Sequence, residues 1–116
     1  MINITNILMT ALKDLPYPKS EAPMKEVPKG AYISWQPGAI SRKMASGKCF
    51  EETQLADVGL VVPDGENYQD IMVLVLQTLK RGDKIRYAHL TDVQYIADIK
   101  KRCITMEVCA RQEADA

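Results

Sequence analysis

The sequence predicts an α+β fold in which a mostly antiparallel sheet carries a protruding hairpin and is backed by an N-terminal helix and a longer second helix. Helical patterns at residues 5–14 and 68–81 are mixed with alternating strand patterns and do not follow a strict strand–helix–strand order. The 116 residues suffice for one domain and not for two. With 47% hydrophobic and 26% charged residues, the composition is not that of a disordered chain. We therefore expect a single domain over residues 1–116.

Charge and cysteine content narrow the classes of function. The 15 basic and 15 acidic residues cancel, so no overall field attracts nucleic acid or anionic lipid. The longest apolar run, residues 71–76, is far shorter than the roughly 20 residues that span a bilayer. The N-terminal stretch lacks the cationic leader of a secretory signal. Three cysteines without a CxxC pair are typical of reduced thiols in a cytoplasm.

The first predicted element is an amphipathic helix over residues 5–14, which leads into a proline-rich connection. Asn3 or Thr5 can cap this helix, because either side-chain oxygen can accept a hydrogen bond from an otherwise free backbone amide. Pro16 ends it, since proline lacks the amide that a helix interior needs. Residues 16–29 hold four of the six prolines, so we expect an extended connection over the surface there.

Two strands, at residues 30–36 and 49–62, are predicted to form the hairpin. The first strand is rich in aromatic and β-branched residues and ends where Pro37 and Gly38 interrupt it. The far half of the second strand alternates between apolar and other residues, whereas its near half, CFEETQ, is polar on both faces and need not lie over the core. Because the joined ends of the two strands are polar, we expect this hairpin to protrude.

The rest of the chain predicts a long helix followed by strands. Residues 68–81 present a wide apolar face, with Asn67 as the N-cap and Gly82 as the stop. Alternation predicts a strand over residues 84–90 that places Ile85, Tyr87 and His89 on one face. A bent or interrupted strand over residues 93–97 continues it, and residues 102–111 form the clearest strand. The polar tail, residues 112–116, is expected to fray.

The sequence shows no set of residues that would perform catalysis or bind a metal. His89 is the only histidine, and no Cys, Asp or Glu stands at a metal-ligand or catalytic spacing from it. The GxSxG, HExxH, GxxxxGK[ST] and GxGxxG motifs do not occur. We therefore predict no enzymatic activity, no catalytic residue, no cofactor and no metal. Exposed strand edges that need a partner favour a component of an assembly.

The order of elements resembles that of the tail terminator, or tail-completion, proteins of tailed bacteriophages and related prophage particles. The resemblance spans nearly the whole chain. It rests on a short N-terminal helix, a proline-rich connection, the strand GAYISW, a hairpin ending in ADVGLVV, the helix YQDIMVLVLQTLKRG and the closing strand CITMEVCA. No invariant signature motif is part of it. The short length and the proline-rich connection depart from the commoner family pattern.

The resemblance implies a structural protein of the virion that forms a hexameric ring on the last ring of tail-tube protein. Such a ring stops tube growth, offers a surface to the neck or head-completion protein, and lets DNA pass through its lumen. It would assemble in the host cytoplasm and then occupy the head-proximal end of the tail. The hairpin near residues 37–54 would reach a neighbouring subunit or the tube. Its mixed charges would set register more than affinity: Arg42, Lys43, Lys48, Glu51 and Glu52.

The sequence is also compatible with two other functions. A neck or head-completion connector of the same particle would also be small, α+β and ring-forming. A small cytoplasmic ligand-binding or regulatory domain, acting as a monomer or dimer, would have the same composition. No membrane partner is expected for any of the three.

Overall fold

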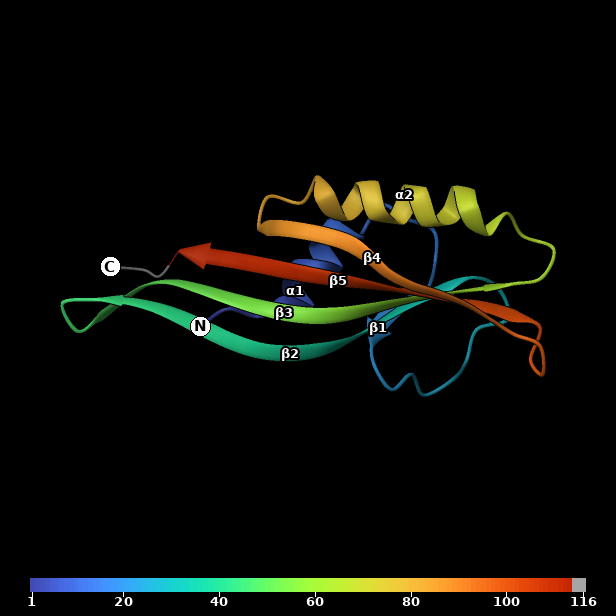
Figure 1. The fold of residues 1–116 in the computed structure, drawn as a ribbon, viewed down its shortest axis with the longest axis horizontal. Helices are drawn as coiled ribbons and strands as arrows, with labels where there is room; N and C mark the ends of the chain where they lie inside the picture. Colours follow the sequence, from blue (N-terminus) through green and yellow to red (C-terminus); the bar gives the residue numbers. More distant parts are fainter. Residues whose placement is uncertain (114–116) are drawn as a thin grey trace.

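The computed structural model describes residues 1–113 as a five-stranded sheet with two helices on one face (Figure 1). The strand order is β1-β2-β3-β5-β4, and every pair is antiparallel except β1 with β2. This confirms the predicted α+β fold. The elements in chain order are α1 (Ile4–Ala11), β1 (Lys19–Glu21), β2 (Tyr32–Ala45), β3 (Lys48–Pro63), α2 (Tyr68–Lys80), β4 (Ile85–Ile96) and β5 (Lys101–Glu113).

Both helices begin at an asparagine cap. The Asn3 side-chain oxygen accepts a hydrogen bond from the Asn6 amide at 3.2 Å, and Asn67 accepts one from the Asp70 amide at the same distance. Each bond satisfies a backbone donor that has no partner within its helix. The predicted N-cap of α2 is therefore confirmed, and Asn3 rather than Thr5 caps α1. α1 ends at Ala11, earlier than its apolar stripe suggested.

The core lies between one face of the sheet and the two helices. Alternate residues of β3 and β5 are buried, and the residues between them, except buried Cys109, are half-buried or exposed, as expected for strands covered mainly on one face. Trp35 is 1% exposed, and its indole nitrogen donates to the Thr5 hydroxyl at 3.1 Å. The largest fully buried side chains are Trp35, Ile4, Leu8, Leu12, Ile33, Leu60, Leu79, Ile104, Met106, Val58, Val62 and Val75.

The hairpin of β2 and β3 is longer than predicted. Pro37 and Gly38 do not end β2; the strand continues to Ala45, with a register shift between Pro37 and Ile40. Proline is tolerated there because β1 pairs only with Ile33–Trp35, so the outer edge of β2 has no strand partner at Pro37. β1 itself lies within the proline-rich connection. The hairpin gives the molecule a longest dimension of 55 Å, and it protrudes as predicted (Figure 1).

The polar near half of β3 is covered, contrary to the expectation that it need not lie over the core. Glu52 and Gln54 are 6% and 8% exposed. The N-terminal segment crosses both residues: the Ile2 amide donates to Glu52 at 3.0 Å, and the Ile4 amide donates to Gln54 at 3.2 Å. Two polar side chains thus satisfy backbone groups of a segment that belongs to no strand.

Two register shifts in β4 overturn its predicted alternation. Ile85 pairs with Ala110, whereas Tyr87 pairs with Cys109, the next residue along β5, so a bulge lies between them. Ile85 therefore faces the core, and Tyr87 and His89 lie on the opposite, open face. The second shift falls between Leu90 and Asp92. The bend expected near residue 93 is thus a bulge within one continuous strand.

The end of the chain also differs from the prediction. Gln112 and Glu113 do not fray but continue β5, where they pair with Glu52 and Glu51 of β3. The other residues of the expected tail, 114–116, lie outside the described residues.

We predict that Leu79→Ala destabilises the fold by about 2–5 kcal/mol, because Leu79 is fully buried where α2 packs on the sheet. Leu74→Ala is the matched control: Leu74 lies on the same helix, is 42% exposed, and should cost no more than about 0.5 kcal/mol. Urea denaturation followed by circular dichroism measures both. Equal losses of stability in the two variants would contradict the observed packing of α2.

Candidate partner interface

The hairpin arm, defined as residues 37–54, is the first candidate site. Beyond Glu51 the arm has no pairing with β5, and from Gln36 onward β2 has no outer neighbour. Ser46 and Gly47 close the arm with φ values of 51° and 76°. Two successive residues with positive φ are typical of the tight turn whose twist matches that of a hairpin. The tip therefore extends as two strands paired only with each other.

Four of the five predicted interface residues form ion pairs with each other within the arm. The Arg42 guanidinium lies 3.0 Å from a Glu52 carboxylate oxygen, and the Lys43 ammonium lies 3.4 Å from Glu51. Each pair joins residues that stand directly opposite each other in the register of β2 and β3. These charges therefore favour the observed register of β2 with β3 within one chain, and the register predicted between neighbouring subunits stays a prediction. Lys48 lies near the tip and forms no ion pair with residues 1–113.

Glu52 connects the arm to the body of the protein. One carboxylate oxygen accepts from the Ile2 amide, and the other accepts from Arg42. A buried carboxylate with partners of this kind on both oxygens is well satisfied. Glu51 is less well satisfied. The Arg111 guanidinium lies 3.9 Å from one Glu51 carboxylate oxygen, and the other oxygen of Glu51, Oε1, has no hydrogen bond among the residues described. Glu52 thus has a structural role at the root of the arm.

The apolar side chains of the arm tip are candidate contacts that the sequence analysis did not identify. Met44 is 56% exposed and Phe50 is 49% exposed. Large exposed apolar side chains serve as anchors at protein interfaces more often than surface charges do. Phe50 is the only phenylalanine of the chain and stands within an otherwise polar stretch. A single phenylalanine among polar residues is the sequence feature that could have identified Phe50 as a candidate contact.

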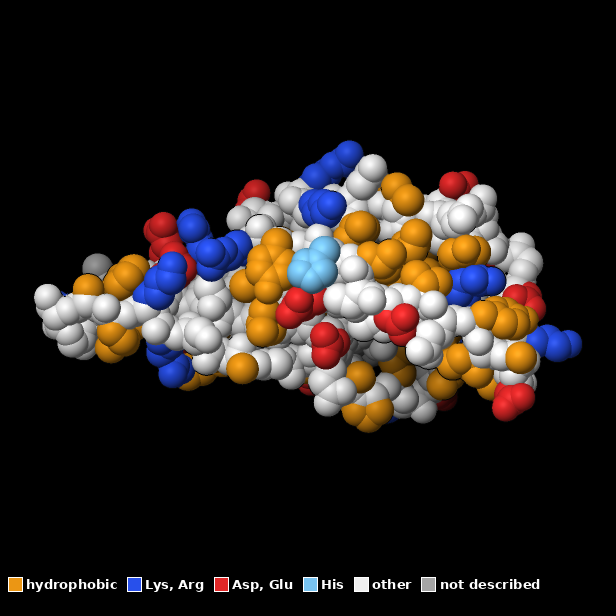
Figure 2. Space-filling model, in the orientation of Figure 1, with side chains coloured by type: hydrophobic (Ala, Val, Ile, Leu, Met, Phe, Trp, Pro, Cys, Tyr) orange, Lys and Arg blue, Asp and Glu red, His pale blue; other side chains and the backbone are white. Residues whose placement is uncertain are grey.

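The edge of the sheet formed by β4 is the second candidate site. β4 is 12 residues long and lies at the end of the strand order, so its outer edge has no partner within residues 1–113. Figure 2 shows hydrophobic side chains gathered along this side of the molecule, below α2. We define the β4 edge patch as the apolar residues of the strand that are between 37% and 45% exposed: Tyr87, Leu90, Val93, Tyr95 and Ile96.

His89 lies on the open face of the sheet, next to residues distant in the sequence. Its Nε2 atom is 3.0 Å from a Glu107 carboxylate oxygen, and its ring stacks on Tyr87 with centroids 5.3 Å apart. The sequence analysis missed Glu107 because cross-strand pairing of β4 with β5 brings it there. Asp57 lies opposite Glu107 on β3. His89 is exposed and Glu107 is half-buried, and polar contacts at the surface contribute little to stability.

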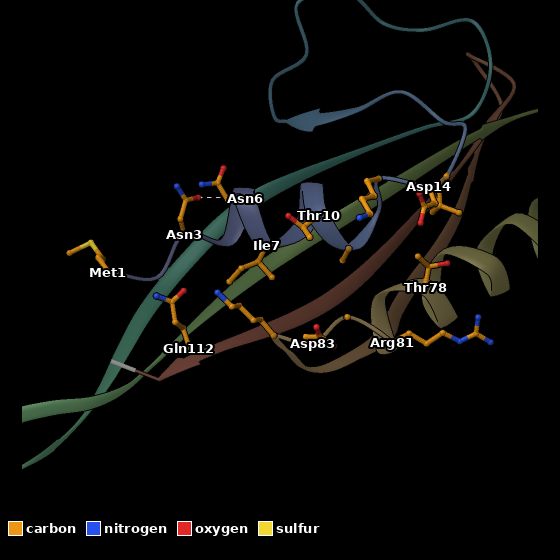
Figure 3. A pocket seen from close by; sticks show the side chains of 15 residues that line it. Met1, Asn3, Asn6, Ile7, Thr10, Asp14, Thr78, Arg81, Asp83 and Gln112 are labelled. Carbon is orange, nitrogen blue, oxygen red and sulfur yellow. Dashed lines mark hydrogen bonds between the residues drawn. The ribbon is translucent and has the colours of Figure 1, made fainter. Parts of the chain in front are cut away.

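A groove of about 750 Å³ lies between α1 and the turn that follows α2 (Figure 3). Side chains of both signs line it, among them Asp14, Arg81 and Asp83, and all three are exposed. Figure 3 shows Asn3 and Asn6 at one end of the groove and Arg81 at the other. His89 does not line it. The groove therefore gathers no buried titratable group.

Within residues 1–113, no three His, Cys, Asp or Glu side chains are placed to hold a metal ion. The same residues contain no helix with the length and hydropathy of a membrane span. No protein family model and no curated protein matches the chain.

We predict that Glu52→Ala destabilises the protein by about 1–3 kcal/mol, because it leaves the Ile2 amide and Arg42 without their acceptor. Hydrogen exchange at Ile2 and Ile4 should accelerate more than exchange in α2. Glu26→Ala, at an exposed glutamate, is the control. Unchanged exchange at Ile2 in Glu52→Ala would show that Glu52 does not hold the N-terminal segment.

Cysteine labelling gives a second prediction. Burial raises the pKa of the Cys109 thiol above its ordinary value, and Cys109 is 5% exposed. Because the thiolate is the reactive form, iodoacetamide should label Cys109 more slowly than the half-buried Cys49 and Cys103. Mass spectrometry of the native protein should show two fast adducts and one slow adduct, and all three should react fast in urea. Equal native rates would contradict the observed burial.

Proposed function

We propose that this protein is a tail terminator of a tailed bacteriophage or a related prophage particle, acting as a ring on the end of the tail tube. The observation that carries the proposal is the arm, which extends two strands and two exposed apolar side chains beyond the body of a small domain. Exposed apolar groups on a projecting hairpin favour contact with another subunit. The observed order of helices and strands agrees with the resemblance from which the proposal came.

The proposed mechanism is steric. In a closed ring, each subunit contacts the next through two different surfaces, and rotation closes the set. One face of the ring would match the last ring of tail-tube protein and stop its growth. The other face would receive the neck or head-completion protein, and DNA would pass through the lumen. The ring would form in the host cytoplasm as a hexamer and become part of the virion.

A non-enzymatic role is part of the proposal. The only histidine is exposed, its Nε2 atom lies 3.0 Å from a Glu107 carboxylate oxygen, and it does not line the groove beside α1. The most buried carboxylate, Glu52, has hydrogen-bonding partners within the chain on both oxygens. Neither group combines a pocket with a free acid, base or nucleophile, the combination by which catalytic sites are recognised.

The test is assembly with purified tail tubes. We expect the protein to form rings, visible by negative-stain electron microscopy, and to bind one end of each tube in stoichiometric amounts. Sedimentation of tubes with and without the protein measures binding. Binding to the portal side of the particle, with no binding to tubes, would instead support a neck connector. A protein that stays monomeric and binds neither would contradict the proposal.

We predict that Phe50→Ser weakens ring formation without loss of stability, because it removes an exposed apolar group from the arm tip. The control is Val27→Ser, an exposed apolar residue of the proline-rich connection, 62% exposed and far from the arm in sequence. Analytical ultracentrifugation at equal concentrations measures ring formation, and thermal melting measures stability. Intact rings in Phe50→Ser would show that the tip does not contact a neighbour.

A further inference from the structure

We infer that the β4 edge of one copy receives the arm of a second copy, so that β2 of the arm adds a strand to the sheet. The inference rests on the proposed ring and names the two surfaces that meet within it. Three observations carry it: an unpaired edge at β4, a second free edge on the arm, and complementary side chains on the two.

The β4 edge carries two bulges, but it lacks the proline and lysine residues by which exposed strands also avoid pairing. Between Ile85 and Ile96 the strand contains no proline, no glycine and no lysine. Its apolar side chains form the β4 edge patch, whose Leu90 and Val93 stand beside buried Met106 and Ile104 of β5. Leu90 and Val93 therefore continue the core outward to an open edge, whereas Tyr87 of the patch lies on the open face. A long apolar edge with free backbone groups is a template for an added strand.

The arm provides the second free edge. β1 covers β2 only at residues 33–35, which leaves the outer edge from residue 36 to residue 45 without a strand. Pro37 has no amide to donate, so the segment that can pair is the one beyond it, Ala39–Ala45. This edge and the β4 edge lie at opposite ends of the strand order. When the arm edge of one copy pairs with the β4 edge of the next, two unlike surfaces meet. Such a head-to-tail contact is what ring closure requires.

The side chains of the two surfaces are complementary. The arm tip carries exposed Met44 and Phe50, which suit the apolar β4 edge patch. The tip also carries Lys48, a cation with no ion pair within residues 1–113. On β4, Asp92 is exposed and likewise forms no ion pair among these residues. Opposite charges would favour this contact over arm-to-arm pairing, which would bring basic tips together.

The first test places a charge on the edge. In Val93→Lys, a lysine replaces a residue that is 37% exposed, and we expect association to weaken at least about tenfold by analytical ultracentrifugation, because the new charge would be desolvated within the apolar β4 edge patch. Val73→Lys makes the same change on α2 at a residue that is 47% exposed and should leave ring formation unchanged. Leu90→Lys repeats the test on the same edge if Val93→Lys melts early.

The outcomes separate this inference from the proposed function. If the wild-type protein and Val73→Lys form rings and cap tubes, and both β4 variants do so equally well, the β4 inference is wrong and the tail-terminator proposal stands. A wild-type protein that forms two-fold dimers through β4 contradicts the head-to-tail contact. If the wild-type protein neither associates nor caps tubes, both proposals are wrong.

A mixing experiment tests whether the two surfaces bind each other. Phe50→Ser keeps an intact β4 edge, and Val93→Lys keeps an intact arm. Mixed under reducing conditions, the two variants should form a one-to-one dimer by native mass spectrometry, because only one complete contact exists between them. Each variant alone should stay monomeric. No dimer in the mixture, or rings formed by Val93→Lys alone, would overturn the pairing of arm with edge.

Discussion

The structure depends on the burial of one face of the sheet, where α1 lies over β3 and α2 lies over β4 and β5. From Ala56 to Val62 every second residue of β3 is buried and apolar, and β2 and β5 align their own apolar residues with it. The apolar residues fill one side of the sheet only, so the opposite face stays open. Where the apolar pattern of β3 ends, at Gln54, the hairpin leaves the core and becomes the arm. The position of the core therefore determines where the arm begins.

The arm keeps its direction because polar contacts replace the missing core. Glu52 and Gln54 hold the N-terminal segment across the root of the arm, and Glu52 also binds Arg42 on the partner strand. A buried carboxylate favours one arrangement, since any other arrangement leaves a desolvated charge without a partner. Four of the charges expected at a subunit contact thus form ion pairs that orient the arm. In the proposed ring, Met44, Phe50 and Lys48 would contact the neighbouring subunit.

The two ends of the sheet differ in a way that suits a directional assembly. One end is polar and interrupted, with the three-residue β1 and the arm beyond it. The other end is a continuous strand with a partly exposed apolar patch. A chain with two unlike free edges can join copies in sequence, whereas two like edges would close as a dimer. This asymmetry is the physical link between the fold and the proposed ring.

Local patterns in the sequence were enough to predict the α+β class, α2 with its Asn67 cap, and the strands that became β3 and β5. Caps and periodicity act among residues a few positions apart, so a single sequence contains them. The tertiary structure alone decided the burial of Glu52, which bonds a residue 50 positions away, the bulges of β4, and the meeting of His89 with Glu107. All three features depend on which distant segments lie side by side in the folded protein. Packing across the whole chain determines that arrangement.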